Sequence, residues 1–252
     1  MKGWFLPLRN GLIIVSLMPT PFISPMTTFV IPAPPQASTE VHGTSNRFPV
    51  RRILCVGRNY AAHRREMGGD DRDPPFFFSK PADALVESAS SAIAYPLATS
   101  DLHHEIELVA ALGAGGADVP VGSALDLVFG YAAGVDLTRR DLQNAAKAKG
   151  APWEAAKAFD QSAPMGPLRR AEGGQPEGRI WLSVNGTVRQ DALVSDMIWN
   201  VAEIISQASR LWRLAPGDLI FTGTPEGVGP LVRGDKVEGG VDGVGGVSFS
   251  VT

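Results

Sequence analysis

Short apolar runs bounded by glycine and proline dominate the pattern from Arg51 onward. Ile53 to Val56 is such a run, and Phe76 to Phe78 follows a pair of prolines. Runs this short between turn residues are typical of buried strands. Leu102 to Leu112 predicts a longer strand, with alternation clearest at its start, and Gly130 to Val135 predicts another.

The clearest turn signal is Asn185-Gly186, which lies between the segments Ile180 to Val184 and Thr187 to Gln190. An Asn-Gly pair favours the tight turn of a two-residue β-hairpin. Leu219 to Phe221 predicts a strand near the C-terminus. The tail beyond it intersperses glycines with apolar residues, as paired strands do.

Four segments predict helices: Tyr60 to about Met67 with Asn59 as its cap, Ala124 to Phe129, Leu137 to Lys149, and Ser195 to Leu211. The 28 glycines and 20 prolines of the chain suit many turns and short strands better than a helical bundle.

Residues 1–50 have a different character from the rest. The apolar run from Leu12 to Met18 follows Lys2 and Arg9 and superficially resembles a secretory signal, but it is too short to span a membrane. We predict an N-terminal arm or linker over 1–50, with Met26 as an alternative start, and a catalytic domain over 51–252. Without an export signal, the expected location is cytoplasmic.

The 252 residues include 23 basic and 26 acidic side chains, a formal charge of −3. This balance provides no bulk attraction to nucleic acid or to an acidic membrane. The chain has neither GxxxxGK[ST] nor a GxGxxG that opens a helix, which argues against phosphate-loop chemistry. Its single cysteine, Cys55, excludes an intramolecular disulfide and is expected to be buried in a strand.

Two glutamates, Glu105 and Glu107, carry the clearest chemical signal. Side chains alternate along a strand, so both glutamates face one side, while Ile106 and Leu108 face the core on the other. A hard divalent cation removes the repulsion between neighbouring carboxylates. Asp136, at the end of an apolar run, is a candidate third ligand. The pattern also fits an exposed strand face with two solvated glutamates.

A second pair, His63 and Glu66, is spaced i and i+3 on the first predicted helix. A histidine oriented by a carboxylate can act as a general base toward water. Because Arg64 and Arg65 lie between them, a surface ion pair explains the same spacing.

Two further cations are candidates for substrate contact. Lys157 lies among small and apolar residues, where it can either stabilise a developing enolate or extend to solvent. Arg139 and Arg140 follow Asp136, and a guanidinium matches a carboxylate bidentately. A solvated helix face explains the arginines equally.

Taken together, these residues resemble the fumarylacetoacetate hydrolase family from about Arg51 to the C-terminus. Seven ordered blocks carry the resemblance: Leu54–Tyr60 with His63 and Glu66, Phe77–Pro81, His104–Leu108, Phe129–Asp136 with Arg140–Gln143, Ala156–Asp160, Ser195–Ile198 and Thr222–Gly229. The resemblance implies an α+β, mainly β fold with a rolled mixed β-sheet and a few peripheral helices. It also implies a homodimer.

The resemblance also implies roles for individual residues. Glu105, Glu107 and Asp136 would bind Mg²⁺ or Mn²⁺, and His63, Glu66 and Lys157 would be catalytic. Contacts with substrate would come from Lys80, Arg140, Gln143 and Thr224.

The activity that the resemblance implies is metal-dependent hydrolysis of a carbon–carbon bond in an acylpyruvate, a small 2,4-dioxo acid. Bacterial fumarylpyruvate hydrolases of aromatic catabolism are the most similar branch, followed by acylpyruvases. The same site could decarboxylate oxaloacetate or isomerise a related dioxo acid. A protein that binds metal only for stability is the non-enzymatic alternative.

Overall fold

The computed structural model describes residues 28–60, 73–87 and 91–252. The chain divides into two compact units, Met1–Pro35 and Gln36–Thr252, and the second is described below. The predicted helix from Tyr60 to Met67, with His63 and Glu66, lies outside the described residues apart from Tyr60. Within those residues, no helix combines the length and the apolar character needed to cross a membrane.

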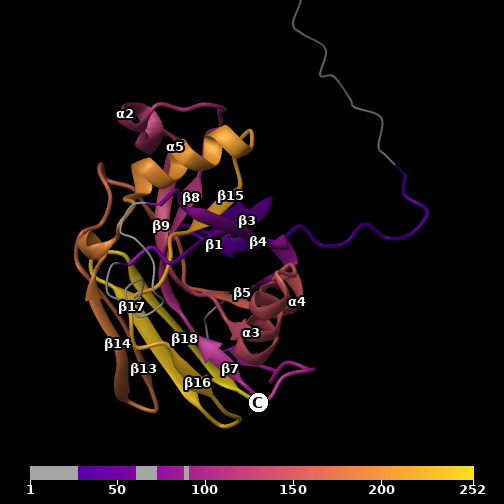
Figure 1. Cartoon of the computed structure of the whole chain (residues 1–252). Coiled ribbons are helices and arrows are strands. Elements are labelled where there is room, and N and C mark those ends of the chain that lie inside the picture. The colour runs from indigo at the N-terminus through magenta and orange to yellow at the C-terminus, as the bar shows by residue number, and fades with distance from the viewer. Residues whose placement is uncertain (1–27, 61–72, 88–90) are drawn as a thin grey trace, which may run out of the picture. The chain divides into compact units, whose positions relative to one another are not determined.

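A mixed eight-stranded sheet forms the centre of the second unit (Figure 1). Its strand order is β4 (Phe76–Lys80), β3 (Arg52–Gly57), β15 (Asp218–Phe221), β8 (Ile106–Leu112), β9 (Val128–Val135), β11 (Ala163–Met165) and β5 (Leu85–Glu87), with β12 (Arg169–Arg170) paired to β9. The pairs β3–β15 and β5–β11 are parallel, and the other neighbours are antiparallel. The strands predicted at Ile53, Phe76, Gly130 and Leu219 are confirmed.

A second sheet has five strands in the order β14 (Thr187–Leu193), β13 (Arg179–Val184), β17 (Lys236–Val241), β18 (Gly245–Val251) and β6 (Ser91–Ile93). The predicted hairpin is confirmed, because β13 and β14 pair antiparallel on either side of Asn185-Gly186. Both turn residues have positive φ, 52° and 77°, as a type I′ turn requires.

Two small sheets complete the β structure: β10 (Thr138–Arg139), β7 (Leu102–His104) and β16 (Gly229–Leu231) in one, and β1 (Ser38–Glu40) with β2 (Arg47–Pro49) in the other. Phe48 of β2 is buried in an apolar cluster together with Val41 and Val50, which directly follow β1 and β2. The compact unit therefore includes residues 36–50, which the sequence pattern assigned to the arm.

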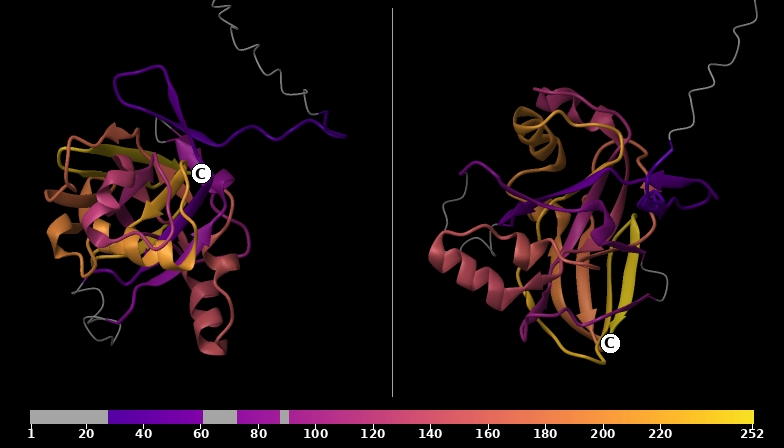
Figure 2. Two further views of the ribbon diagram at one scale, coloured as in Figure 1. Left: turned by 90° about the horizontal axis from the view of Figure 1, so that it is seen from above. Right: turned by 90° about the vertical axis from the view of Figure 1, so that its right-hand side faces the viewer.

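The α-helices in the described residues are α2 (Val121–Ala124), α3 (Arg140–Lys149), α4 (Glu154–Lys157) and α5 (Val201–Leu211). Three 3₁₀ turns accompany them: η1 (Ala82–Ala84), η2 (Leu125–Leu127) and η3 (Val194–Asp196). Figures 1 and 2 show α3 beside α4 and α2 beside α5, at different parts of the sheet structure. The predicted mainly β fold with few peripheral helices is confirmed.

Three predicted helices have different limits in the structure. The helix predicted from Leu137 begins at Arg140, because Thr138 and Arg139 pair with β7 as a strand. The helix predicted from Ser195 begins after Asn200, whose side chain accepts a hydrogen bond from the backbone of Glu203 in a capping box. The segment predicted from Ala124 to Phe129 is short helical turns followed by β9.

Strand β8 is buried on both faces, which places it at the centre of the unit. Ile106 and Leu108 belong to the apolar cluster shared with the five-stranded sheet and α5. Val109 and Ala111 face the other cluster, shared with β2, β3 and β15. Glu107 lies between Ile106 and Leu108 in the strand. Its side chain therefore points to the opposite face, away from the cluster that contains those two residues.

The single strand predicted from Leu102 to Leu112 is wrong at one position. The chain is interrupted at Glu105: β7 pairs with β10 and β16, whereas β8 pairs with β15 and β9. Glu105 therefore lies where the chain passes from one sheet to another. The exchange of partners breaks the ladder at this residue, which local alternation does not reveal.

Candidate metal centre

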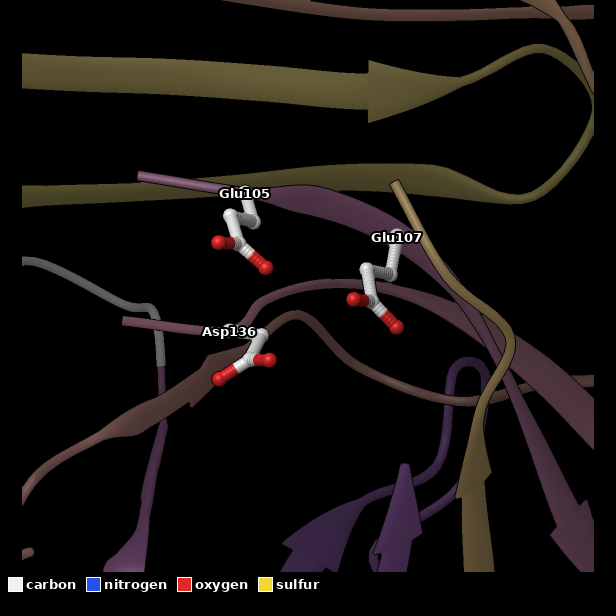
Figure 3. A group of neighbouring side chains, drawn as sticks. All are labelled: Glu105, Glu107 and Asp136. Carbon is white, nitrogen blue, oxygen red and sulfur yellow. The ribbon is translucent and has the colours of Figure 1, made fainter. Parts of the chain in front are cut away.

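Three carboxylates converge where β8 and β9 lie side by side. Glu107 is on β8, Glu105 precedes that strand, and Asp136 follows β9. The backbone N–H of Asp136 donates to the carbonyl of Glu105 at 2.8 Å, which continues the antiparallel pairing past the strand ends. Ligand oxygens of the three side chains lie within 4.8 Å of one another. Figure 3 shows the three carboxylates gathered in one place.

All three carboxylates are buried. The exposed fraction is 7% for Glu105, 1% for Glu107 and 0% for Asp136. This excludes the solvated strand face that the sequence pattern left open. Burial of several carboxylates requires compensating charge, because each desolvated anion costs several kcal/mol, roughly, when it is left unpaired.

Lys157 provides part of that charge from α4. Its Nζ lies 2.9 Å from Glu105 Oε2 and 2.5 Å from Asp136 Oδ2, and it donates to Thr138 Oγ1 at 2.6 Å. Burial lowers the pKa of Lys157, but the carboxylates of Asp136 and Glu105 outweigh burial and raise it above its usual value. The lysine is therefore a buried ammonium at the centre of the site, and the alternative of a solvent-directed side chain is excluded.

Lys80, at the end of β4, approaches Asp136 from another direction. Its Nζ lies 2.8 Å from Asp136 Oδ1, donates to the carbonyl of Leu137 at 3.2 Å, and also donates to the carbonyl of Lys157. Lys80 thus contacts both the aspartate and the segment that carries the second lysine. Direct contact between Lys80 and substrate stays a prediction.

Arg140 opens helix α3 and forms an ion pair with Glu105. It also donates to Gln143 Oε1 at 2.5 Å, one helical turn further on. Burial by itself would raise the pKa of Glu105, but Lys157 and Arg140 hold it well below its usual range. The Glu105 carboxylate is therefore ionised and ready to act as a ligand.

Glu107 has a different environment. It accepts a hydrogen bond from the backbone N–H of Gly223 at 2.8 Å, and among the described residues no cationic side chain forms an ion pair with it. Burial, and then the nearby Asp136 and Glu105 carboxylates, raise the pKa of Glu107. A divalent cation held by all three carboxylates would stabilise the ionised form of Glu107. The buried oxygen donor set thus fits a hard divalent metal.

The cavity beside the carboxylates is lined by three of the four residues predicted to contact substrate, namely Arg140, Gln143 and Thr224. Lys80 is absent from its lining. Cys55, as expected, is buried in β3 and free. His63 and Glu66 lie outside the described residues.

Sequence patterns did not identify Gln190, a buried residue of β14. Its amide oxygen lies 3.0 Å from the backbone nitrogen of Ile106 and 3.0 Å from His104 Nδ1. Its amide nitrogen donates to Thr224 Oγ1 at 2.8 Å and to the carbonyl of Pro225 at 3.0 Å. Gln190 is buried in a strand whose other residues are exposed or half-buried, and no alternation in the sequence marks it.

Comparison with known proteins shows the family of the chain. The family model described as fumarylacetoacetate (FAA) hydrolase, C-terminal, matches residues 52–252. The chain belongs to the fumarylacetoacetate hydrolase family. A crystal structure of fumarylpyruvate hydrolase from Pseudomonas aeruginosa, in complex with Mn²⁺ and pyruvate, superposes with a TM-score of 0.87 at 50% identity. The matched region covers 89% of this chain and 99% of the Pseudomonas aeruginosa chain.

Relatives in this family differ in activity. Fumarylpyruvate hydrolase of Ralstonia sp is 46% identical over 177 residues, or 70% of this chain and 92% of the relative. The mitochondrial oxaloacetate tautomerase of Mus musculus is 43% identical over 203 residues, which are 80% of this chain and 91% of the relative. The chain is therefore an enzyme of this family with a site suited to a divalent metal. Its substrate preference is a separate question.

Proposed function

We propose that the chain hydrolyses the carbon–carbon bond of an acylpyruvate, with fumarylpyruvate as substrate and fumarate and pyruvate as products. The observation that carries the proposal is the contact of Lys157 Nζ with Glu105 and Asp136, at the edge of a cavity lined by Arg140 and Gln143. This arrangement combines a carboxylate metal site with a buried ammonium. Both groups can stabilise negative charge that develops on oxygen.

Glu105, Glu107 and Asp136 would hold Mg²⁺ or Mn²⁺, which when bound supplies a Lewis acid for the oxygens of the 2-oxo acid group. Arg140, and Gln143 beside it, would orient the substrate carboxylate. The guanidinium group can donate two parallel hydrogen bonds to such a group.

The reaction requires one water molecule. His63, oriented by Glu66, would accept a proton from that water, and the hydroxide would add to the carbonyl carbon of the acyl group. The bond between that carbon and the neighbouring methylene then breaks, and its electron pair remains on the pyruvate half as an enolate. Lys157 stabilises the enolate oxygen. Protonation of the methylene carbon gives pyruvate, and the acyl half leaves as a carboxylate.

Pyruvate release from fumarylpyruvate tests the proposal. We expect fast release by protein supplied with Mg²⁺ or Mn²⁺, loss of release with EDTA, and loss of both metal binding and release in the Glu105→Ala/Glu107→Ala variant. Continued turnover after loss of metal binding would contradict the proposal. Unfolding by EDTA, in place of simple inactivation, would support a purely structural metal.

The second candidate is conversion of oxaloacetate, favoured by the 43% identity to the oxaloacetate tautomerase of Mus musculus. Decarboxylation and tautomerisation of oxaloacetate need no attacking water. His63→Ala should therefore abolish hydrolysis of fumarylpyruvate, whereas decarboxylation of oxaloacetate could persist. Comparing the two substrates on this variant separates the candidates.

A further inference from the structure

Helix α3 turns one polar face toward the cavity beside the carboxylates. Arg140, Gln143 and Lys147 are spaced i, i+3 and i+7, which places them on the same side of a helix, and all three line that cavity. At 1.5 Å per residue, Lys147 lies about 10 Å along the helix axis from Arg140. The face therefore runs from the Glu105 ion pair away from the carboxylates.

Lys147 is held in place by an aromatic ring. Its Nζ lies 5.0 Å from the centroid of Trp153, and that ring packs against Phe76 at 4.8 Å. Half-burial, then the charges of Arg140 and Arg58, lower the pKa of Lys147 to about 8. The ammonium thus lies close to other cations, and a bound anion would offset the repulsion between them.

Arg58 lines the same cavity from the end of β3. Its backbone has φ of 60°, in the left-handed region that side chains other than glycine, asparagine and aspartate rarely adopt. Strained backbone of this kind is found preferentially at binding and catalytic sites.

The cations that line this cavity fall into two groups. Arg140 and Lys157 are paired with the buried carboxylates. Arg58 and Lys147, in contrast, form no ion pair within residues 28–60, 73–87 and 91–252. The cavity therefore contains two positive charges that its own carboxylates do not neutralise.

We propose that Arg58 and Lys147 form a second anion subsite, which binds a carboxylate at the far end of the acyl group. The substrate class is then a 2,4-dioxo diacid, and acylpyruvates with uncharged acyl groups are poor substrates. The inference rests on the proposed function for the position of the 2-oxo acid end at the three carboxylates.

The cavity itself has a volume of about 30 Å³, so a diacid must also extend into the space next to it. The spacing along helix α3 is comparable to the length of a diacid of about seven carbons. Three backbone bonds span about 3.8 Å, so six bonds separate the terminal carboxylate carbons of such an acid by roughly 7–8 Å. This is somewhat less than the run of about 10 Å from Arg140 to Lys147, and both side chains can lean toward the ligand.

An uncharged aromatic acyl group is the competing occupant. A neighbouring cavity of about 510 Å³ is lined by Phe76, Phe77, Phe78 and Trp153, and it shares Phe78, Trp153 and Lys157 with the first. Arg58 is exposed and Lys147 is half-buried, and neither forms an ion pair with a described residue. These two cations favour the carboxylate, because an anion gains charge-assisted hydrogen bonds from them that an apolar ligand cannot make.

Binding of two matched acids tests the subsite without catalysis. 2-Oxoheptanedioate and 2-oxoheptanoate have the same chain length, lack the second oxo group needed for cleavage, and differ only in the far carboxylate. By calorimetry on the Mn²⁺-loaded full-length protein, we expect the diacid to bind about tenfold more tightly or better. Equal affinities, or tighter binding of the monoacid, would overturn the proposal.

Variants assign the preference to the two residues. Arg58→Gly removes the charge and suits the left-handed backbone, so it should fold, and Lys147→Met keeps the apolar stem over Trp153. In each variant, the ratio of the affinity for 2-oxoheptanedioate to the affinity for 2-oxoheptanoate should fall toward one. Lys149→Met, an exposed lysine on the same helix, should leave it unchanged. Preservation of the preference in both Arg58→Gly and Lys147→Met would contradict the assignment.

The same variants separate this inference from the proposed function. If the wild-type protein prefers the diacid but releases no pyruvate from fumarylpyruvate, the hydrolase proposal fails and the subsite stands. If it hydrolyses fumarylpyruvate and acetylpyruvate with similar kcat/KM, and the variants lower neither selectively, the subsite fails and the hydrolase proposal stands.

Discussion

The side-chain oxygen of Gln190 accepts a hydrogen bond from the backbone N–H of Ile106 at 3.0 Å, although 84 positions separate the two residues. Ile106 lies between the two glutamates of the candidate metal centre. The hairpin that carries Gln190 is therefore tied directly to the segment that holds Glu105 and Glu107. The same amide also contacts Thr224, which lines the cavity.

Substitution of Gln190 by leucine should weaken both the fold and the metal site. The change leaves the Ile106 N–H and the Thr224 hydroxyl buried without this partner, and we expect a loss of about 2–4 kcal/mol in the free energy of unfolding. Urea denaturation measures the loss, and titration with Mn²⁺ should show weaker binding. Arg189→Leu, an exposed neighbour, should change stability by less than about 0.5 kcal/mol. Similar stability of the two variants would contradict this role.

Gly223 orients Glu107, and an alanine there should disturb the carboxylate. Its φ is 98°, its N–H donates to Glu107, and an added Cβ would lie 2.7 Å from the Cβ of Asn59. We expect Gly223→Ala to lower Mn²⁺ affinity measurably by calorimetry. Gly234 has nearly the same φ, 93°, but open space around it and no contact with the site. Gly234→Ala should therefore carry the backbone strain alone and retain wild-type Mn²⁺ affinity.

Lys157 and a bound metal compensate the same carboxylates. Without metal, Lys157→Met leaves Glu105 and Asp136 with less positive charge, and removal of one partner of a buried ion pair costs about 3–5 kcal/mol. Mn²⁺ should therefore raise the melting temperature of Lys157→Met more than that of the wild type. The value of kcat should fall about 10²–10³-fold. An equal rise in melting temperature for both proteins would show that the lysine does not neutralise the site.

The preference for a diacid should depend on pH through Lys147. Its pKa is lowered to about 8, first by burial and then by neighbouring cations, so the side chain is charged below that pH and loses its charge as the pH rises through it. The charged groups that face it are Arg140, Arg58, Glu105 and Lys157. We expect the affinity ratio of 2-oxoheptanedioate to 2-oxoheptanoate to decline between pH 7 and pH 9.

Lys147→Arg is the matched control for this pH dependence. A guanidinium stays protonated throughout that range, so the affinity ratio should remain level from pH 7 to pH 9. A decline of the same size in Lys147→Arg would assign the titration to another group.

Local patterns were sufficient for much of the β structure. The Asn185-Gly186 hairpin and the strands at Ile53 and Leu219 follow from turn chemistry and short apolar runs, which act over a few residues. Alternation also placed Glu105 and Glu107 on a common side, and the close approach of their oxygens agrees with it. The break at Glu105 was not predictable, since it depends on which distant strands pair with each half.

The sequence by itself determined which residues could carry the chemistry: two alternating glutamates, an aspartate after a buried strand, and a lysine among small residues. Tertiary structure decided whether these groups were solvated or buried, because burial depends on the packing of β8 between two apolar clusters. It also decided which charges are neutralised. Lys157 reaches two of the carboxylates, while Lys147 and Arg58 form no ion pair with any residue that the structure describes. Only pairing between distant segments creates that difference.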